Sequence, residues 1–118
     1  MVRKDGPETA FLTRWGRSLA QAFPEAAEAL RDLADGVYDG EVLVPDAEGR
    51  SDFAELRRRL LLQRPRLIEV AATKTPAVLM LFDILALNGT DLRHLPLIER
   101  KALLAAHVQP RPHLQVVE

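Results

Sequence analysis

Two acidic residues separated by a single glycine are the first candidates for chemistry. Asp39 and Glu41 flank Gly40 within the otherwise largely apolar stretch 37–44. Side chains alternate along a strand, so both carboxylates are expected on one face, about 6 to 7 Å apart. Such a pair repels itself unless a cation, an amide or a hydroxyl compensates. Magnesium, an arginine or a ribose would serve, whereas a solvent-exposed strand edge explains the pattern without any ligand.

A Phe-Asp pair is the second candidate, inside the apolar stretch 77–87. Adjacent strand residues point to opposite faces, so Phe82 could stack on a base while Asp83 faces the other way. A phenylalanine in such a stretch is more often a core residue. Asp83 is harder to explain without a ligand or partner, because a carboxylate in a buried strand requires one.

The third candidate is Arg14, in the segment 13–17. An arginine can bind a phosphate or carboxylate through two parallel hydrogen bonds, and Gly16 permits a turn that would present it. The alternative is a surface turn with solvated arginines. Three successive arginines, residues 57–59, spread around a helix, so we expect mainly a solvated face, with one or two at most meeting DNA phosphate.

Strands and helices are expected to alternate and so to position these residues. The predicted strands are residues 9–13, 37–44, 77–87 and 114–117. The predicted helices are residues 24–34, 52–64, 67–72 and 96–107. Asp52 and Glu55 have the spacing of a capping box, residues 45–49 and 73–76 are expected loops, and Asn88-Gly89 is a strong turn signal. This order allows a parallel α/β sheet, and periodicity does not distinguish it from a mixed α+β fold.

The composition of the chain fits one globular domain of 118 residues with 47% hydrophobic content. Its net charge of -1 creates no overall attraction to nucleic acid or to anionic membranes, so any DNA contact requires a local patch. The absence of cysteine excludes disulfides and thiolate metal sites, and the three histidines lack zinc-site spacing. No apolar run approaches membrane-spanning length and no secretion signal is evident, so a soluble, cytoplasmic protein without a membrane partner is expected.

Taken in order, several segments resemble the ATP-dependent DNA ligases, particularly the bacterial ligases associated with end joining. They are Thr13-Arg14-Trp15-Gly16 (S/T-R-x-G), Phe23-Pro24-Glu25, Asp39-Gly40-Glu41 (D-G-E), Asp52-Phe53 with Leu56 and Leu60, Phe82-Asp83-Ile84-Leu85 (F-D-x-L), and the stretch 91–100 (D-L-R-x-L-P-L-x-E-R). Each segment is a weak signal alone, but together and in this order they cover nearly the whole chain.

The resemblance implies an α+β fold, a partial nucleotidyltransferase (ATP-grasp-like) adenylation domain with antiparallel sheets flanked by helices. It implies that Phe82 stacks on adenine, that Arg14 lies near the phosphates or ribose, and that Glu41 contacts the ribose or a catalytic metal. Asp39 is expected to support the strand. ATP and Mg²⁺ are the implied cofactors, and nicked double-stranded DNA is the implied substrate, in repair and recombination.

The family reaction begins when a lysine in a K-x-D-G motif attacks the α-phosphate of ATP, which gives a lysyl-AMP. The adenylate then passes to a 5′-phosphate at a nick, and the 3′-hydroxyl displaces AMP. Lys4-Asp5-Gly6 lacks the middle residue of that motif and lies too close to Arg14. The resemblance instead places Lys4 at a hairpin tip, several residues after the nucleophile, so no catalytic residue is assigned.

Residues 1–118 are therefore expected to be an incomplete adenylation domain. The nucleophile motif, the later E-G-x-V-x-K and K-x-K motifs and the oligonucleotide-binding fold would lie outside it. The leading hypothesis is a ligase fragment that is inactive alone, with a complementary ligase segment as a further expected partner. The alternatives are a non-catalytic nucleotide- or DNA-binding remnant and a structural or interaction module without a ligand.

Overall fold

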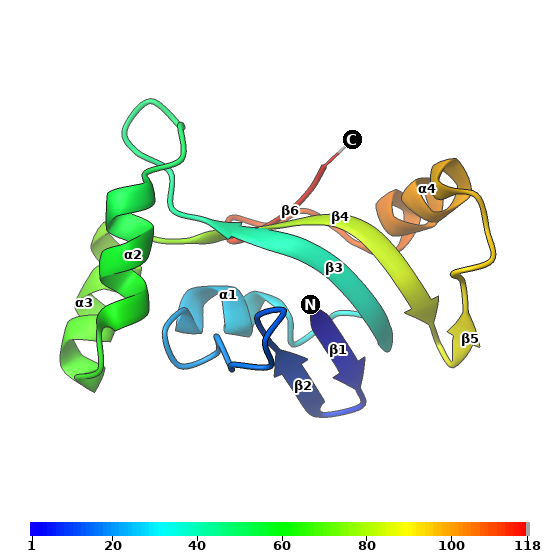
Figure 1. Cartoon of the computed structure of the whole chain (residues 1–118), viewed down its shortest axis with the longest axis horizontal. Helices are drawn as coiled ribbons and strands as arrows, with labels where there is room; N and C mark the ends of the chain where they lie inside the picture. Colours follow the sequence, from blue (N-terminus) through cyan, green and yellow to red (C-terminus); the bar gives the residue numbers. More distant parts are fainter. Residues whose placement is uncertain (118) are drawn as a thin grey trace.

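The computed structural model describes residues 1–117, which fold around one six-stranded sheet (Figure 1). The strands are β1 (Val2–Asp5), β2 (Glu8–Phe11), β3 (Gly36–Leu43), β4 (Val78–Leu87), β5 (Thr90–Asp91) and β6 (Leu114–Val116). The helices are α1 (Pro24–Ala29), α2 (Phe53–Leu61), α3 (Pro65–Lys74) and α4 (Leu97–His107). None of these helices is both long and apolar enough to cross a membrane.

The sheet is antiparallel apart from one pair of strands. Its order is β2-β1-β3-β4-β5, and β6 runs parallel to β4 on the edge that β4 also shares with β5. In Figure 1, α2 and α3 lie together at one end of the sheet and α4 lies at the other. The α+β prediction is confirmed, and a purely parallel sheet, which the order of elements had left open, is wrong.

The core forms where β3 and β4 meet the helices. Tyr38, Leu81 and Ile84 from the sheet are fully buried together with Phe23 and Leu30 around α1. The Tyr38 hydroxyl donates to the Ala34 carbonyl oxygen at 2.5 Å, and burial raises the pKa of Tyr38 to about 12. The packing of Tyr38 in the core therefore fixes β3 at the residue immediately before Asp39.

Turn and cap signals located most element boundaries correctly. Asn88 and Gly89 both have positive φ angles, 49° and 85°, as a two-residue hairpin turn of type I′ requires. The Asp52 carboxylate accepts a hydrogen bond from the Glu55 amide at 3.0 Å, which confirms the predicted start of α2. Pro65 both follows α2 and begins α3, because a proline at the first helical position has no amide to leave unpaired.

Other boundaries differ from the predictions. α1 ends at Ala29 rather than at residue 34, α3 continues to Lys74 through part of the expected loop, and the short strands β1 and β5 were not expected. β1 and β5 are recognisable only from their partners: β1 pairs with both β2 and β3, and β5 pairs with β4 over two residues. Short strands of this kind carry little periodicity of their own.

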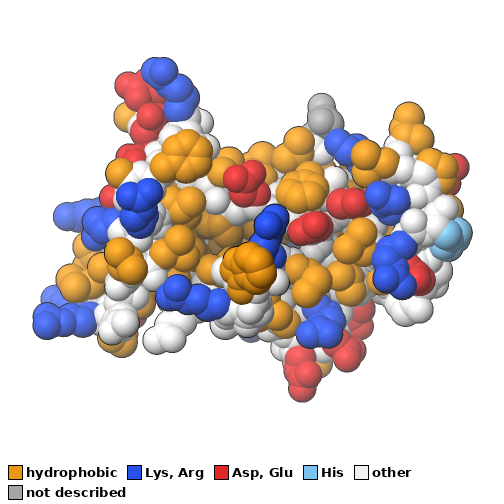
Figure 2. All heavy atoms as spheres, viewed as in Figure 1, with side chains coloured by type: hydrophobic (Ala, Val, Ile, Leu, Met, Phe, Trp, Pro, Cys, Tyr) orange, Lys and Arg blue, Asp and Glu red, His pale blue; other side chains and the backbone are white. Residues whose placement is uncertain are grey.

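Basic side chains are unevenly distributed on the surface. Residues 50–74 contain six exposed Lys and Arg, besides a buried one, against three Asp and Glu, although the whole chain has a net charge of -1. Figure 2 shows Lys and Arg side chains gathered over α2 and α3 on the face in view. The local patch that a DNA contact would need is therefore present.

Candidate nucleotide site

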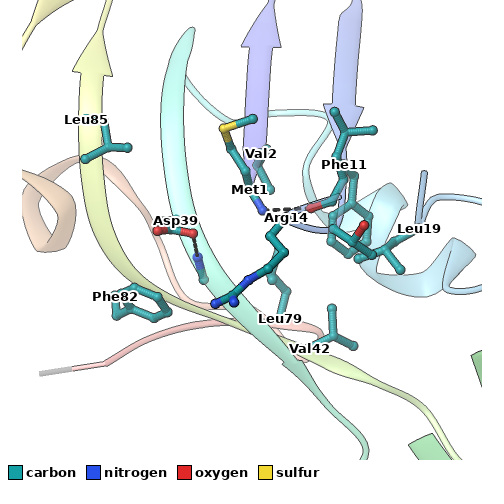
Figure 3. Close-up of a pocket in the computed structure, with 13 residues that line it drawn as sticks. Met1, Val2, Phe11, Arg14, Leu19, Asp39, Val42, Leu79, Phe82 and Leu85 are labelled. Atoms are coloured by element: carbon teal, nitrogen blue, oxygen red, sulfur yellow. Dashed lines mark hydrogen bonds between the residues drawn. The ribbon is translucent and has the colours of Figure 1, made fainter. Parts of the chain in front are cut away.

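A cavity of about 470 Å³ opens between the β1–β2 hairpin, the turn that follows it, and the paired strands β3 and β4 (Figure 3). Its lining is mostly apolar, with a few polar groups. The lining residues are Met1, Val2, Phe11, Leu12, Thr13, Arg14, Leu19, Asp39, Gly40, Val42, Leu79, Phe82 and Leu85. A concave apolar wall with few convergent polar groups is the usual form of a small-molecule site.

Phe82 lines this cavity because β4 is locally irregular. The pairing runs from Asp39 with Asp83 to Gly40 with Leu81, so Phe82 is the extra residue of a β-bulge. Its side chain remains 37% exposed. Bulges redirect side chains and concentrate near functional sites, so the ring is presented to the cavity and not packed into the core.

Asp83 points away from the cavity, as the alternation predicts. Its Oδ1 accepts from Arg100 Nε at 2.9 Å and its Oδ2 accepts from Arg100 Nη2 at 3.2 Å. Arg100 also donates to the Leu95 carbonyl oxygen at 2.7 Å, and the Asp83 carboxylate raises the pKa of the guanidinium. The expected partner of Asp83 is thus an arginine on α4, and the pair ties that helix to β4.

Arg14 reaches into the cavity from the turn after β2. Figure 3 shows its guanidinium extending past Leu79 toward Phe82, on the side of Asp39. Within residues 1–117 the Arg14 side chain makes no hydrogen bond to the protein. A guanidinium held beside an aromatic ring and an apolar floor, with its donors free, suits an anionic or hydroxyl-bearing ligand.

Asp39 and Glu41 occupy different surroundings. Asp39 lines the cavity, and its Oδ1 accepts from the Gly40 amide at 3.1 Å, at the point where the strand pairing becomes irregular. Glu41 is exposed and is not part of the lining. The structure therefore brings Arg14 and Phe82 together and leaves Glu41 two residues further along β3.

Gly40 is where two backbones approach closely. A Cβ built at Gly40 would lie 2.5 Å from the Met80 carbonyl oxygen and 3.0 Å from a Leu81 methyl carbon. A glycine inside a strand often marks a bulge or a close approach of another backbone, and both are present here. Any larger residue would push β3 and β4 apart beside Phe82.

Metal binding by protein groups alone has little support in the part of the chain that is described. Residues 1–117 contain no group of three or more His, Cys, Asp or Glu placed to hold an ion. Magnesium, however, is commonly held by one or two carboxylates together with substrate phosphates and water. A single carboxylate such as Glu41 fits that mode of binding.

Lys4 lies outside the cavity lining. It is on β1, its side chain is only 8% exposed, and its ammonium group donates to the Gly6 carbonyl oxygen within the β1–β2 hairpin. Gly6 has a φ of 58° at the hairpin turn. The expected hairpin is therefore present, with its turn at Gly6-Pro7 and Lys4 in the strand that leads into it.

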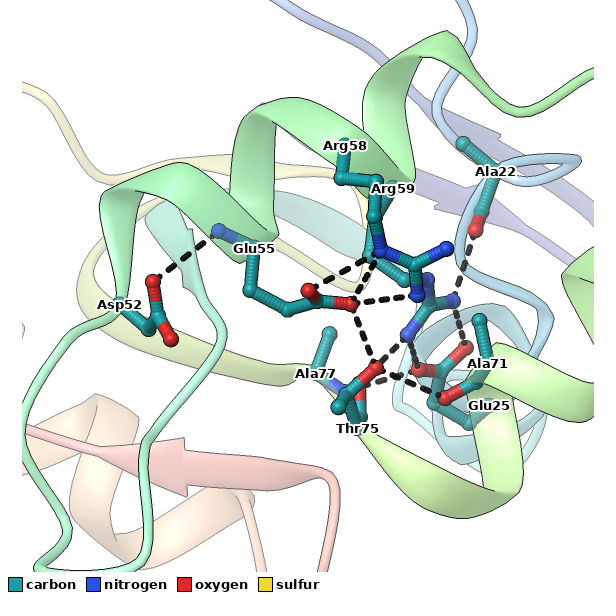
Figure 4. A network of polar contacts seen from close by, with 9 residues as sticks. All are labelled: Ala22, Glu25, Asp52, Glu55, Arg58, Arg59, Ala71, Thr75 and Ala77. Carbon is teal, nitrogen blue, oxygen red and sulfur yellow. Dashed lines mark hydrogen bonds and ion pairs between the residues drawn. The ribbon is translucent and has the colours of Figure 1, made fainter.

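The prediction that residues 57–59 form a mainly solvated face is wrong for Arg59, which is fully buried (Figure 4). Arg59 binds both Glu25 oxygens, at 2.6 and 2.9 Å, and donates to the carbonyl oxygens of Ala22 and Thr75, both at 2.8 Å. Its guanidinium also lies 5.0 Å from the Phe23 ring centroid. The charge is buried because α1 and the end of α3 supply its partners, which no local pattern reveals.

The same polar network joins three helices and the start of β4. Glu25 accepts from the Ala77 amide at 2.8 Å, and Glu55 accepts from the Thr75 hydroxyl at 2.9 Å and from Arg58. A hydrogen bond from Arg58 lowers the pKa of Glu55. Sequence reasoning assigned Glu25 only to a helix start, so the network was missed.

Together, the mixed sheet, the flanking helices and the cavity define an α+β nucleotidyltransferase domain. The family model described as ATP dependent DNA ligase domain matches residues 1–118, and the chain belongs to that family. The residues that first suggested the family are thus found in the expected elements.

Individual relatives agree with the family match. DNA ligase C2 of Mycolicibacterium smegmatis is 39% identical over 103 residues, which cover 86% of this chain and 28% of that protein. A DNA ligase of Caldivirga maquilingensis is 33% identical over 116 residues, which cover 94% of this chain and 19% of that protein. The chain therefore spans less than a third of the length of these two relatives.

Two solved structures share the fold. The ligase domain of LigD from M. tuberculosis superimposes with a TM-score of 0.69 at 27% identity, over 99% of this chain and 35% of that one. A mycobacterial DNA ligase D complexed with ATP and MES gives a TM-score of 0.68 at 27% identity, with the same coverage.

Proposed function

We propose that this chain forms the adenosine-binding wall of a DNA ligase adenylation site. The observation that carries the proposal is the convergence of Arg14 and Phe82 on one cavity from elements almost 70 residues apart in the chain. A similar structure at 27% identity is a ligase complexed with ATP, which supports the choice of nucleotide. Residues 1–118 would then be one part of an adenylation domain.

Phe82 would stack on the adenine ring. Its side chain is partly exposed, and the apolar side chains of Val42 and Leu79, which line the same cavity, would cover other parts of the nucleoside. Stacking of a base on an aromatic side chain is worth about 1–3 kcal/mol. The bulge at Phe82 is what makes the ring available for this contact.

Arg14 would bind the ribose or the phosphates, because its donors are free and face the same cavity. Glu41 would contact the ribose or one Mg²⁺ at the cavity edge, where the exposed carboxylate can meet a ligand that extends from the lining. Mg²⁺, when bound, would offset charge on the phosphates, as phosphoryl transfer generally requires. Asp39 would hold the bulge through its bond to Gly40 and would take no part in the chemistry.

The covalent step of the family needs a lysine in a K-x-D-G motif, which residues 1–118 do not contain. We therefore assign no catalytic residue to this chain and propose that the nucleophile, the later lysine motifs and an oligonucleotide-binding fold come from other segments. With those parts, the substrate would be nicked double-stranded DNA. Without them, charge on the triphosphate is poorly compensated and no lysyl-AMP forms.

Titration with ATP, with and without magnesium, tests the binding wall. Phe82→Ala should weaken ATP binding about tenfold, in line with the loss of one stacking contact. Phe53→Ala is the matched control, because Phe53 is 68% exposed at the start of α2 and does not line the cavity. Equal affinities for wild type, Phe82→Ala and Glu41→Ala would remove the site assignment.

Mass spectrometry after incubation with ATP and magnesium tests the assignment of no nucleophile. We expect no covalent gain of AMP. A stable adenylate on Lys4 would overturn the conclusion that this lysine serves only the hairpin.

A further inference from the structure

The turn between β2 and α1 exposes the only tryptophan in the sequence. Trp15 is 86% exposed, more than any other large hydrophobic side chain described in residues 1–117. An isolated surface hydrophobic residue needs no explanation, but an indole at the tip of an ordered turn beside a ligand site does. The features of the turn itself indicate what it would contact.

The turn is held rigidly by its own hydrogen bonds. Thr13 Oγ1 accepts from the amides of Trp15 and Arg17, at 3.3 and 3.1 Å, and the Thr13 amide donates to the Arg17 carbonyl oxygen at 2.8 Å. Gly16 takes a φ of 85°, which a side chain would disfavour. The backbone of the turn is therefore ordered, and it holds Trp15 at an exposed tip.

Arginines stand close to Trp15 in the sequence on both sides. The Arg14 guanidinium carbon lies 6.0 Å from the Trp15 ring centroid, and Arg14 also lines the nucleotide cavity. Arg17 is exposed and donates to the Leu60 carbonyl oxygen at the end of α2 at 3.3 Å. The turn thus lies between the cavity and the basic surface of α2 and α3.

A shallow polar hollow continues from Arg17 toward α3. It measures about 360 Å³ and is lined by Arg17, Ser18, Gln21, Ala22, Leu60, Leu62 and Gln63. Arg64 and Arg66, which follow Gln63, are both exposed. Figure 2 shows the basic side chains over α2 and α3 on the viewed face. An aromatic platform that leads into a positively charged, hydrogen-bonding groove is the arrangement that holds a nucleic-acid strand.

We propose that Trp15 is a DNA-binding residue that stacks on an uncovered base at an interruption in the duplex, while Arg17 and the hollow beside it bind the adjoining phosphates. The proposal rests on the proposed ligase function and adds to it the residue that recognises the interruption. Bases inside an intact duplex offer no free face to an indole. The turn therefore favours a strand end over continuous DNA, whether that end is an unstacked base at a nick or the edge of a gap.

The single tryptophan makes the contact directly measurable in the unmodified chain. Titration with a duplex that contains a one-nucleotide gap, at low salt, should quench the Trp15 fluorescence, and an intact duplex of the same sequence should quench it less. DNA binding without any change in fluorescence would overturn the proposal. So would equal quenching by gapped and intact duplex.

Variants measured by anisotropy of labelled gapped DNA separate stacking from charge. Trp15→Ala should weaken binding about tenfold, and Trp15→Phe should restore much of it, because any aromatic ring can stack on a base. Arg17→Ala should lower the slope of log affinity against log salt by about 0.7 to 0.9, the loss of one phosphate contact. Phe53→Ala is the control and should bind as wild type does.

Thermal unfolding and ATP titration complete the test. Trp15→Ala should unfold at the wild-type temperature and bind ATP with wild-type affinity, because the side chain is exposed and lies outside the cavity lining. If Trp15→Ala bound DNA as tightly as wild type, this inference would fail and the adenosine-binding wall would stand. If Phe82→Ala bound ATP as tightly as wild type while Trp15→Ala still weakened DNA binding, the wall alone would fail.

Discussion

Two arginines show how this fold treats a positive charge in opposite ways. Arg59 lies in the helical corner, which is the junction of α1, α2 and the end of α3, and Arg14 lies in the cavity. Arg59 is fully buried, and four hydrogen bonds to Glu25, Ala22 and Thr75 occupy both of its terminal nitrogens. Arg14 is exposed, and its donors make no bond to residues 1–117. A cation whose two terminal nitrogens are bound to Glu25 and to backbone carbonyls serves the structure, whereas one left free on a turn beside a cavity is available to a ligand.

The backbone around Arg59 is regular, whereas the backbone around the cavity is not. The helical corner is regular, and its polar groups are paired with one another across α1, α2 and α3. The cavity wall is irregular: β3 and β4 lose register at two points, and the irregularity leaves Phe82 partly exposed. Local irregularity in an otherwise well-paired sheet therefore marks the site more clearly than charge does.

Arg59→Ala should give the largest effect and would break the comparison if it did not. Removal of one partner of a buried ion pair leaves Glu25 uncompensated, which costs about 3–5 kcal/mol of unfolding free energy. Urea denaturation followed by circular dichroism measures the loss. Arg58→Ala is the control, because Arg58 is half exposed and its ion pair with Glu55 lies at the surface. Equal stability of the two variants would contradict a structural role for Arg59.

A rise in pH should lower the stability of the fold through Tyr38 in β3. The pKa of Tyr38 is raised from 10.0 to about 12, so the folded state favours the neutral phenol. Its contribution is fully present below pH 10 and is lost as the pH rises toward 12, because the unfolded chain ionises first. Two pH units correspond to about 3 kcal/mol. Unfolding free energies across this range measure the loss.

Tyr38 is the only tyrosine in the sequence, so ultraviolet absorbance of the phenolate reports its titration directly. Tyr38→Phe should flatten the alkaline loss of stability, at the cost of the bond to Ala34. A native-state titration midpoint near 10 would show that burial of this side chain does not govern its ionisation.

Arg14→Ala should give the smallest effect on stability and a clear effect on binding. Its unfolding free energy should stay within about 0.5 kcal/mol of wild type, as is usual for surface substitutions. ATP affinity should fall about tenfold, the range expected for a charge-assisted hydrogen bond. Isothermal titration and denaturation of the same sample provide both values. A stability loss as large as that of Arg59→Ala would erase the distinction between the two arginines.

Most of the secondary structure could be predicted because its signals are local. Asp52 caps α2 and Asn88-Gly89 turns the chain after β4, since a side-chain cap and a positive φ depend on adjacent residues alone. The alternation that separates Phe82 from Asp83 is equally local. β1 and β5 could not be predicted, because two- and four-residue strands exist only through pairing with distant partners.

The candidate site was predictable in part and for the same reason. Motif resemblance selected Arg14, Glu41 and Phe82, and the structure places Arg14 and Phe82 in one cavity while Glu41 remains outside its lining. The bulge that exposes Phe82 depends on the register between β3 and β4, which the sequence of either strand does not reveal. Trp15 was named only as part of a motif, since its exposure depends on what fails to pack over it.

The sequence by itself determined the family, the approximate position of most elements and two of the residues that line the cavity, Arg14 and Phe82, because these follow from motifs, caps and alternation. Only the tertiary structure decided which charged side chains are buried and paired. Arg57, Arg58 and Arg59 are chemically identical neighbours, yet only Arg59 meets Glu25, which lies 34 residues earlier in the chain. Burial and pairing are properties of packed elements, so the distinction between Arg59 and Arg14 exists only in the folded chain.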